Sequence, residues 1–324
     1  MSIAIVSHAA DEHAQAVATE LSSRGSAAQL IDTAAFPAKL RLSIEVDDRH
    51  HKPSLKNGRD LIDCDRLNVV WWRRPQAYAL DPALDASVAG FAYSECHEAM
   101  SGFWHGLDVQ WVNPPALDEI AHHKPLQLKL ARELGLSIPR TLITNDPAAA
   151  RAFIAEQEPN RTIYKTFIAL EEHWRETRVV TREELDALDA VRLAPLIFQE
   201  FVEASADLRV TVFGDQVFAA EVITPDDGYR YDYRVDLDAV TVKPTILPAA
   251  VESALIRLMR RLGIVYGAID LRRTPDEEYV FLEVNPAGEF LFIEQRCELP
   301  LTAAMADLLW RLDRDQGASL RKAS

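Results

Sequence analysis

Two acidic side chains and one amide near the carboxyl end of the chain have the spacing of a metal site. Asp270 lies in the apolar run 267–271, and Glu283 and Asn285 alternate with apolar residues in the run 279–286. The sequence Thr-Pro-Asp-Glu between the runs is typical of a turn, so the two runs predict a β-hairpin. A hairpin folded symmetrically about this turn places Asp270 directly opposite Glu283, with Glu283 and Asn285 on one face.

These three side chains are suited to hold a divalent cation. Carboxylates that face each other across a sheet repel unless positive charge lies between them. Mg²⁺ or Mn²⁺ would remove this repulsion, since both ions bind carboxylate oxygens together with phosphate oxygens. The alternative is a solvated face on which Asp270 and Glu283 point into water or pair with Arg272. The apolar side chains of the hairpin are predicted to face the core: Ile269, Leu271, Val280, Leu282 and Val284.

Composition limits the class of protein. The chain has 324 residues, 35 of them basic and 50 acidic, for a net charge of −15. This charge argues against a nucleic-acid partner, which requires a basic face. No apolar run approaches the roughly 18 residues of a membrane span, and no basic segment opens a secretion signal, so we expect no membrane partner and a cytoplasmic location. Three distant cysteines fit a reducing compartment, and Cys96-His97 with His105 lacks the spacing of a zinc site.

The first third of the chain is predicted to be an α/β domain. Four short apolar runs predict strands, at 3–6, 30–31, 67–72 and 109–112. Two segments with apolar side chains at helical spacing predict helices, at 12–24 and 86–104. The Pro pair after Asn113 ends this pattern, so we expect the first domain to comprise residues 1–115.

The rest of the chain is predicted to contain a lid subdomain, 116–195, and an α+β catalytic subdomain, 196–324. Asp146 is the expected N-cap of one helix, and Thr181 with Glu184 forms the capping box of another. The predicted helices are 118–136, one that starts at Pro147, one that extends from the capping box to about 191, 248–262 and 300–314. Strands are predicted at 141–144, 163–166 and 178–180, in three runs within 196–223, and in the hairpin.

The order of these elements and residues resembles the ATP-grasp superfamily over residues 118–309. The resemblance implies an ATP-grasp fold of mixed α/β class, preceded by an α/β pre-ATP-grasp domain, and a requirement for ATP and Mg²⁺. Asp270, Glu283 and Asn285 are similar to the family's metal-binding triad, in which two Mg²⁺ ions bridge the ATP phosphates.

The same resemblance implies a nucleotide site upstream of the hairpin. Lys124 and Lys165 resemble the two phosphate-facing lysines, which balance the charge of the triphosphate. Gln199-Glu200-Phe201-Val202 resembles the hinge segment, in which the backbone of Glu200 and Val202 pairs with the adenine edge. Asp207 matches the acid that holds the ribose hydroxyls.

A closer resemblance links four passages to the graspetide, or microviridin-type, ligases that cross-link ribosomally made peptides. The passages are the W-x-R-R-P-like Trp71-Trp72-Arg73-Arg74-Pro75, the stretch 124–147, Asp232-Tyr233-Arg234 and the stretch 282–294. The resemblance implies an enzyme that phosphorylates Asp or Glu side chains of a precursor peptide and joins them to Ser or Thr hydroxyls or to Lys amines. It also implies recognition of the leader and core of that peptide, and a homodimer.

The resemblance also suggests catalytic roles. Arg209 and Arg234 would hold the transferring phosphoryl group and the developing oxyanion, tasks suited to a planar guanidinium, although each could instead form a surface ion pair. Asp232 is a candidate general base for the incoming hydroxyl. Arg73 and Arg74 either contact an acidic peptide or cap a neighbouring helix C-terminus, and Trp71 and Trp72 are expected in the core.

Three positions depart from the family pattern. His123 replaces an Asn before the first lysine, Glu289 stands where an amide is common, and the region 166–180 contains no Gly for a phosphate lid, a task that would fall to residues 174–178. Two other functions stay open: a ligase that adds a free amino acid to a small carboxylate, like the glutamate ligases, and a binding module without activity. The metal triad argues against the module, which has no need of it.

Overall fold

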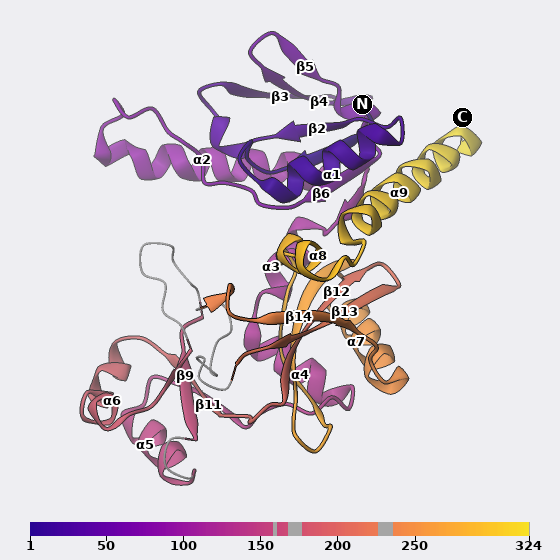
Figure 1. Ribbon diagram of the computed structural model, residues 1–324. Helices are drawn as coiled ribbons and strands as arrows, with labels where there is room; N and C mark the ends of the chain where they lie inside the picture. The colour runs from indigo at the N-terminus through magenta and orange to yellow at the C-terminus, as the bar shows by residue number, and fades with distance from the viewer. Residues whose placement is uncertain (158–160, 168–176, 226–235, 324) are drawn as a thin grey trace.

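The computed structural model describes residues 1–323 except 158–160, 168–176 and 226–235, with side chains described as far as residue 316 (Figure 1). Helices and strands are mixed throughout this part of the chain, as the predicted α/β class requires. Among the described residues, none of the helices combines the length and the apolar character needed to cross a lipid bilayer.

A four-stranded parallel sheet of order β2-β1-β6-β7 forms the upper part of the molecule in Figure 1. Its elements are β1 (Ile3–Val6), α1 (Glu12–Ser23), β2 (Ala28–Ile31), β6 (Val69–Trp72), α2 (Ala86–His105) and β7 (Gln110–Val112). The Asp11 carboxylate accepts a hydrogen bond from the His13 backbone N–H and caps α1. The predicted strands and helices of this region are therefore confirmed.

A three-stranded antiparallel sheet beside it was not predicted. Its strands are β3 (Leu40–Val46), β4 (His51–Asn57) and β5 (Asp60–Ile62), flanked by the 3₁₀ helices η1 (Thr33–Ala35) and η2 (Cys64–Arg66). Only Leu40, Leu55 and Ile62 of this sheet are buried. One buried residue per strand leaves no apolar alternation for the sequence to display.

The lower left of Figure 1 holds a second four-stranded sheet, of order β10-β9-β11-β8. Its elements are β8 (Thr141–Thr144), α5 (Pro147–Ala155), β9 (Thr162–Lys165), β10 (Arg178–Val179), α6 (Arg182–Asp186), η4 (Leu188–Leu193) and β11 (Leu196–Glu200). Asp146 caps α5 as predicted, accepting from the Ala148 N–H at 2.8 Å. The capping box of Thr181 and Glu184 is present, but the helix predicted to extend to 191 is wrong: the α-helix ends at Asp186, and the buried Leu188 and Val191 follow at the three-residue period of a 3₁₀ helix.

The helix predicted over 118–136 is two helices, α3 (Pro115–Ala121) and α4 (Lys124–Glu133). Pro125 explains the break. It lies in the first turn of α4, where its missing N–H costs nothing, whereas inside a continuous helix it would remove a hydrogen bond and clash with the preceding turn. Lys124 thereby becomes the first residue of a helix.

A five-stranded antiparallel sheet of order β14-β13-β12-β15-β16 occupies the centre right of Figure 1. Its elements are β12 (Ala206–Phe213), β13 (Gln216–Ile223), β14 (Thr241–Thr245), α7 (Ala249–Leu262), β15 (Tyr266–Arg273), β16 (Tyr279–Asn285), α8 (Leu291–Cys297) and α9 (Leu301–Ala323). Leu208, Val210 and Val212 of β12 pack on one face against α7. The alternating residues, which include Asp207 and Arg209, therefore face the other side.

The register of the β15–β16 hairpin agrees with the prediction at its functional end. Asp270 pairs with Glu283, and the neighbouring Ile269 pairs with Val284. A bulge then shifts the pairing by one residue, so that Leu271 pairs with Phe281. The predicted core position of Leu282 is therefore wrong: Leu282 is only partly buried, and Phe281, with 0 % exposure, occupies the core instead.

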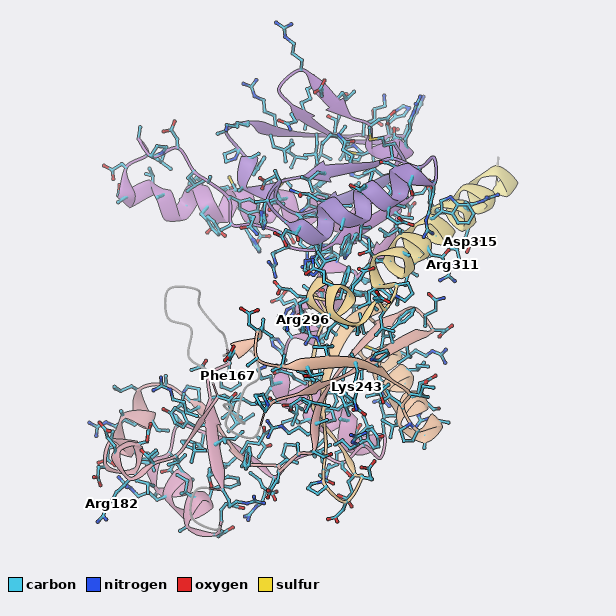
Figure 2. All side chains as sticks on the ribbon, viewed as in Figure 1. Phe167, Arg182, Lys243, Arg296, Arg311 and Asp315 are labelled. Carbon is cyan, nitrogen blue, oxygen red and sulfur yellow. The ribbon has the colours of Figure 1, made fainter. Side chains whose placement is uncertain are left out.

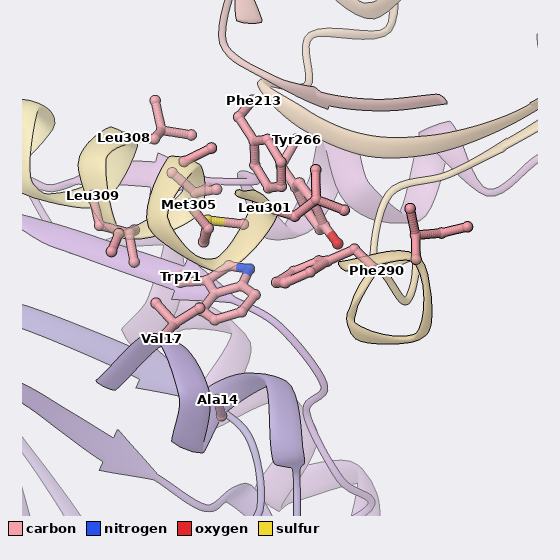
Figure 3. Close-up of a cluster of buried hydrophobic side chains, with 14 of the residues drawn as sticks. Ala14, Val17, Trp71, Phe213, Tyr266, Phe290, Leu301, Met305, Leu308 and Leu309 are labelled. Carbon is pink, nitrogen blue, oxygen red and sulfur yellow. The ribbon is translucent and has the colours of Figure 1, made fainter. Parts of the chain in front are cut away.

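One apolar cluster joins the upper sheet to the five-stranded sheet. Trp71 of β6, Phe213 of β12, Tyr266 of β15, Phe290 and Met305 of α9 lie together in it (Figure 3). The prediction that Trp71 belongs to the core is confirmed, and Trp72 packs on the other face of its strand against Trp104. Arg296 of α8, labelled in Figure 2, donates to Asp238 at 3.2 Å.

Candidate active site

Four charged side chains form a row across the five-stranded sheet. Arg209 of β12 is in register with Asp270 of β15, which is in register with Glu283 of β16. Arg209 Nη1 lies 2.9 and 3.1 Å from the two carboxylate oxygens of Asp270. At the other end of the row, the Lys124 ammonium donates to Glu283 Oε2. Each carboxylate thus faces a cation.

The row is largely withdrawn from water. The exposed fractions of the side chains are 8 % for Arg209 and 17 % for Asp270, and 21 % for Lys124 and 20 % for Glu283. Charges interact more strongly at this depth than at the surface, because less water screens them. Arg209 is fixed further by a hydrogen bond of 2.9 Å from Nη2 to the carbonyl of Glu289.

Gln127 holds Lys124 in place opposite Glu283. Its buried amide donates to the Val284 carbonyl at 2.8 Å and accepts from the Val284 N–H at 3.0 Å, which joins α4 to β16. Sequence reasoning missed this residue. The signal was available, since Gln127 lies one helical turn after Lys124 on the same face of α4.

Asn285 completes the predicted trio at the end of β16. It pairs with Ala268 in the sheet, and its Oδ1 accepts from the Ala287 N–H at 3.0 Å. Among the described residues, no three His, Cys, Asp or Glu side chains lie together in a way that could hold a metal ion. A metal at this hairpin would therefore be bound by two carboxylates and one amide. That donor set fits a hard divalent cation that keeps several non-protein oxygens, as Mg²⁺ does.

Asp207 lies on the same face, two residue pairs further along the sheet. It pairs with Arg272, whose Nε lies 2.8 Å from the Asp207 carboxylate and whose Nη1 donates to the Val202 carbonyl at 2.7 Å. The Arg272 guanidinium also lies 5.2 Å from the centre of the Phe201 ring. A cavity of about 240 Å³ opens here, and its lining includes Phe201, Asp207, Val222 and Arg272. The predicted solvated pairing of Arg272 with Asp270 or Glu283 is thus replaced by a buried pair with Asp207.

The remaining nucleotide candidates belong to the smaller sheet or connect to it. Gln199 is buried and donates to Thr141 Oγ1 at 2.8 Å, and the Glu200 N–H donates to the Arg140 carbonyl at 2.9 Å. Lys165 stands at the end of β9, across from Ile197 of β11. The structure therefore brings Lys124, Arg209, Asp270 and Glu283 into direct contact as one row. Arg272 contacts both Asp207 and the Val202 carbonyl, so these two predicted residues lie close together. Lys165 lies on the smaller sheet.

Two predicted catalytic residues, Asp232 and Arg234, lie outside the described residues, as does most of the predicted lid segment 174–178. Arg73 is fully buried, so the predicted contact with an acidic peptide does not apply to it. It donates to the carbonyls of a loop rather than of a helix end. Arg74 is exposed and pairs with Glu289 at 2.8 Å.

Comparison with known families defines the class to which this fold and site belong. Residues 121–309 match the model of the RimK-like ATP-grasp domain, and residues 2–119 match that of the MvdD pre-ATP grasp domain. The first match covers more than half of the chain, so the protein belongs to the RimK-like ATP-grasp family of ligases. The predicted ATP-grasp fold with an amino-terminal pre-ATP-grasp domain is confirmed.

Solved structures refine this assignment. The macrocyclase MdnC from Microcystis aeruginosa, bound with the precursor peptide MdnA, is 33 % identical, with a TM-score of 0.86 over 96 % of this chain and 100 % of that one. A RiPP-associated ATP-grasp ligase from Chryseobacterium gregarium, in complex with ADP and a leader and core peptide, is 28 % identical, with a TM-score of 0.85 over 95 % and 96 % of the two chains. The predicted resemblance to graspetide ligases is confirmed.

A relative that is named for a different activity shares a shorter segment. The human N-acetylaspartylglutamate synthase A is 32 % identical over 115 residues, which are 35 % of this chain. The match spans 29 % of the length of that relative.

Proposed function

We propose that the protein is an ATP-dependent ligase that cross-links a ribosomally made precursor peptide. An Asp or Glu carboxylate of the peptide would attack the γ-phosphorus of ATP and release ADP. A Ser or Thr hydroxyl or a Lys amine would then attack the acyl phosphate, releasing phosphate and forming an ester or an amide. The observation that carries this proposal is the largely buried row of Arg209, Asp270, Glu283 and Lys124, in a chain similar over 96 % of its length to a macrocyclase bound with its precursor peptide.

The metal end of the site is assigned to the hairpin. Asp270, Glu283 and Asn285 would hold one or two Mg²⁺ ions, or Mn²⁺, since two carboxylates and an amide suit such ions. The metal would bridge and neutralise the ATP phosphates. Arg209, which is held beside Asp270, would bind the transferring phosphoryl group.

The nucleotide end is assigned to the residues around Asp207. Lys124 and Lys165 would bind phosphate oxygens, Asp207 the ribose, and the segment of Gln199, Glu200 and Val202 the adenine. The cavity beside Phe201 and Asp207 supports this assignment, because it offers an aromatic wall and a carboxylate. Arg234 and Asp232 remain the proposed oxyanion ligand and general base.

We also propose a homodimer, a cytoplasmic location and a division into residues 1–115, 116–195 and 196–324. Helix α2 supports the dimer. Its amino-terminal turns expose Phe91 at 70 % and Val88 at 45 %, and these two side chains are three residues apart on one face of the helix. An apolar helix face of this kind is typical of a protein–protein contact. The three free cysteines support the location. The separate sheets support a division into three parts, but β11, residues 196–200, pairs with β8 and β9 and so belongs to the sheet of the second part.

A second candidate is a ligase that adds an amino acid to a small-molecule or protein carboxylate. The observation in its favour is the 115-residue match to N-acetylaspartylglutamate synthase A. The same ATP residues would serve either reaction, so the choice rests on the acceptor.

Mass spectrometry of a peptide encoded beside the gene, incubated with enzyme, ATP and Mg²⁺, tests the proposal. We expect a loss of one water for each ring, abolished by Glu283→Gln, while Glu278→Gln on the exposed turn of the same hairpin retains activity. An unchanged peptide mass, together with cleavage of ATP to ADP that requires a free amino acid, would favour the second candidate. No ATP turnover with either acceptor would contradict both.

A further inference from the structure

Each residue of the segment 286–291, which follows β16, is held by a hydrogen bond. Asn113 donates to the Pro286 carbonyl at 3.2 Å, and Arg209 donates to the Glu289 carbonyl at 2.9 Å. The His13 ring accepts from the N–H groups of Phe290 at 3.0 Å and Leu291 at 3.2 Å. Between these ends lie Ala287 and Gly288, whose carbonyls both accept from Arg73 Nη1. Six consecutive residues, 286–291, thus have a defined partner.

Most of these partners come from outside the ATP-grasp domain. His13, Arg73 and Asn113 belong to the part of the chain that matches the pre-ATP-grasp model. Phe290 itself lies beside Trp71 and Tyr266 in the cluster that joins the two parts (Figure 3). The amino-terminal part therefore holds the loop through polar contacts set into an apolar interface.

Arg73 is the central member of this set. Its side chain has 0 % exposure, and its Nε lies 3.2 Å from Oδ2 of Asp11. Ser7 Oγ donates to the same oxygen at 2.6 Å. Burial alone would raise the pKa of the Asp11 carboxyl, but the interactions with His13, Arg73 and Ser7 hold that pKa well below its usual range. Asp11 is therefore a fixed negative charge that holds the guanidinium.

Two short connections link the carbonyls held by Arg73 to proposed site residues. The Ala287 N–H donates to Oδ1 of Asn285 at 3.0 Å, so the residue whose carbonyl Arg73 binds also orients this amide through its N–H. The Glu289 carbonyl, one residue after Gly288, accepts from Arg209. The loop is also closely packed, because a Cβ on Gly288 would lie 2.3 Å from the Ala268 Cβ and 3.1 Å from Arg209 Nη2. A shift of this loop would move both Asn285 and Arg209.

We infer that Arg73, held by Asp11, is a positioning residue for the metal end of the active site. It would act through the 287–289 loop, setting the Asn285 amide and the Arg209 guanidinium, without touching substrate. The inference rests on the proposed function, since it takes Asn285 as a metal ligand. It gives the W-x-R-R-P-like segment a role: Arg73 orients the loop, while the adjacent Arg74 forms a surface pair with the Glu289 side chain.

Binding measurements separate this role from a general loss of stability. Affinity for ADP without metal reports the nucleotide end, and affinity of the ADP complex for Mn²⁺, measured by electron paramagnetic resonance, reports the metal end. For Arg73→Met we expect metal-free ADP affinity within twofold of wild type and Mn²⁺ affinity roughly 10- to 100-fold weaker, the usual cost of losing an outer support of a metal site. Arg74→Met, which removes an equal charge one residue away, should change neither by more than twofold.

Asp11→Asn provides a second, milder variant in case Arg73→Met does not fold. Asn caps a helix about as well as Asp, so α1 keeps its cap while the charge that fixes Arg73 is lost. We expect its Mn²⁺ affinity to fall between those of wild type and Arg73→Met. Circular dichroism and thermal unfolding verify that each variant is folded.

The outcomes are distinct. The inference is overturned if folded Arg73→Met and Asp11→Asn bind Mn²⁺ within twofold of wild type, or if Arg74→Met weakens Mn²⁺ binding as much as Arg73→Met. It is also overturned if Arg73→Met weakens ADP and Mn²⁺ binding equally, which indicates a general structural role. If wild-type protein binds neither ADP nor Mn²⁺, the proposed function itself fails, and the inference fails with it.

Discussion

The two sheets that carry the proposed nucleotide contacts are supported by cores of very different size. Within the described part of the chain, the cluster behind β12–β16 contains 20 buried residues, whereas the cluster beside β8–β11 contains six. The large sheet holds the charged row and the predicted metal trio, and the small sheet holds Lys165 and Gln199. Local unfolding costs less free energy where fewer apolar contacts break. We therefore expect the large sheet to be rigid and the small sheet to open independently of it.

Truncating one buried phenylalanine in each core tests this difference and has the largest expected effect. Phe281, with 0 % exposure, belongs to the large cluster, and Phe153, with 7 %, to the small one. Each Phe→Ala change should cost about 3–5 kcal/mol of local stability. Hydrogen exchange should show Phe153→Ala exposing β8–β11 while β12–β16 stay protected, and Phe281→Ala weakening protection of the large sheet. Equal loss of protection in both sheets of Phe153→Ala would contradict the comparison.

The variant Lys124→Met tests whether the ion pair with Glu283 controls metal binding at the hairpin, and its expected effect is moderate. The ammonium of Lys124 neutralises Glu283 in this structure, so it competes with a cation for the same carboxylate. We expect the variant to bind Mn²⁺ about fivefold to tenfold more tightly without nucleotide, and ADP more weakly, as a single lost charge contact predicts. Lys129→Met, which removes an exposed pair with Glu133, is the matched control. Unchanged or weaker Mn²⁺ binding by Lys124→Met would show that Lys124 does not compete with a cation for Glu283.

The smallest expected effect is the pH dependence of stability that comes from Asp118, which lies in α3. Burial raises the pKa of the Asp118 carboxyl to about 6, while His122 and Asn113 act in the opposite direction. A folded-state pKa above the usual value near 3.8 means that the fold favours the protonated form. Its contribution to stability is present below about pH 4 and is lost as the pH rises through 6. Lowering the pH from 7.5 to 5 should therefore raise the Tm of wild type relative to Asp118→Asn by about 2 °C. A difference in Tm that is constant across this range would contradict the raised pKa.

The sequence allowed the β15–β16 hairpin, with its proposed metal ligands, to be predicted because its signals are local. A turn and two alternating runs determine which residues face each other, and the structure has Asp270 opposite Glu283. The bulge could not be predicted, because Leu282 is as apolar as the Phe281 that displaces it from the core. The break before Pro125 was visible in principle, since a proline inside a helical pattern marks a boundary.

The supports of the site could not be predicted, because they join residues far apart in the chain. Arg73 is separated from Gly288 by 215 positions, and Gln127 from Val284 by 157. Nothing in the pattern around Arg73 and Arg74 distinguishes a buried guanidinium from an exposed one. Only the packing of β6 against the loop after β16 separates their roles.

The bulge in the hairpin has a consequence for how the chain can vary in length. Leu271 pairs with Phe281 and Asp270 with Glu283, so Leu282 is the extra residue between two otherwise adjacent pairs. A homologue that lacks this one position would have regular pairing along the whole hairpin, with the equivalents of Asp270 and Glu283 still opposite each other. Loss of a residue elsewhere in either strand would instead turn every later side chain to the wrong surface.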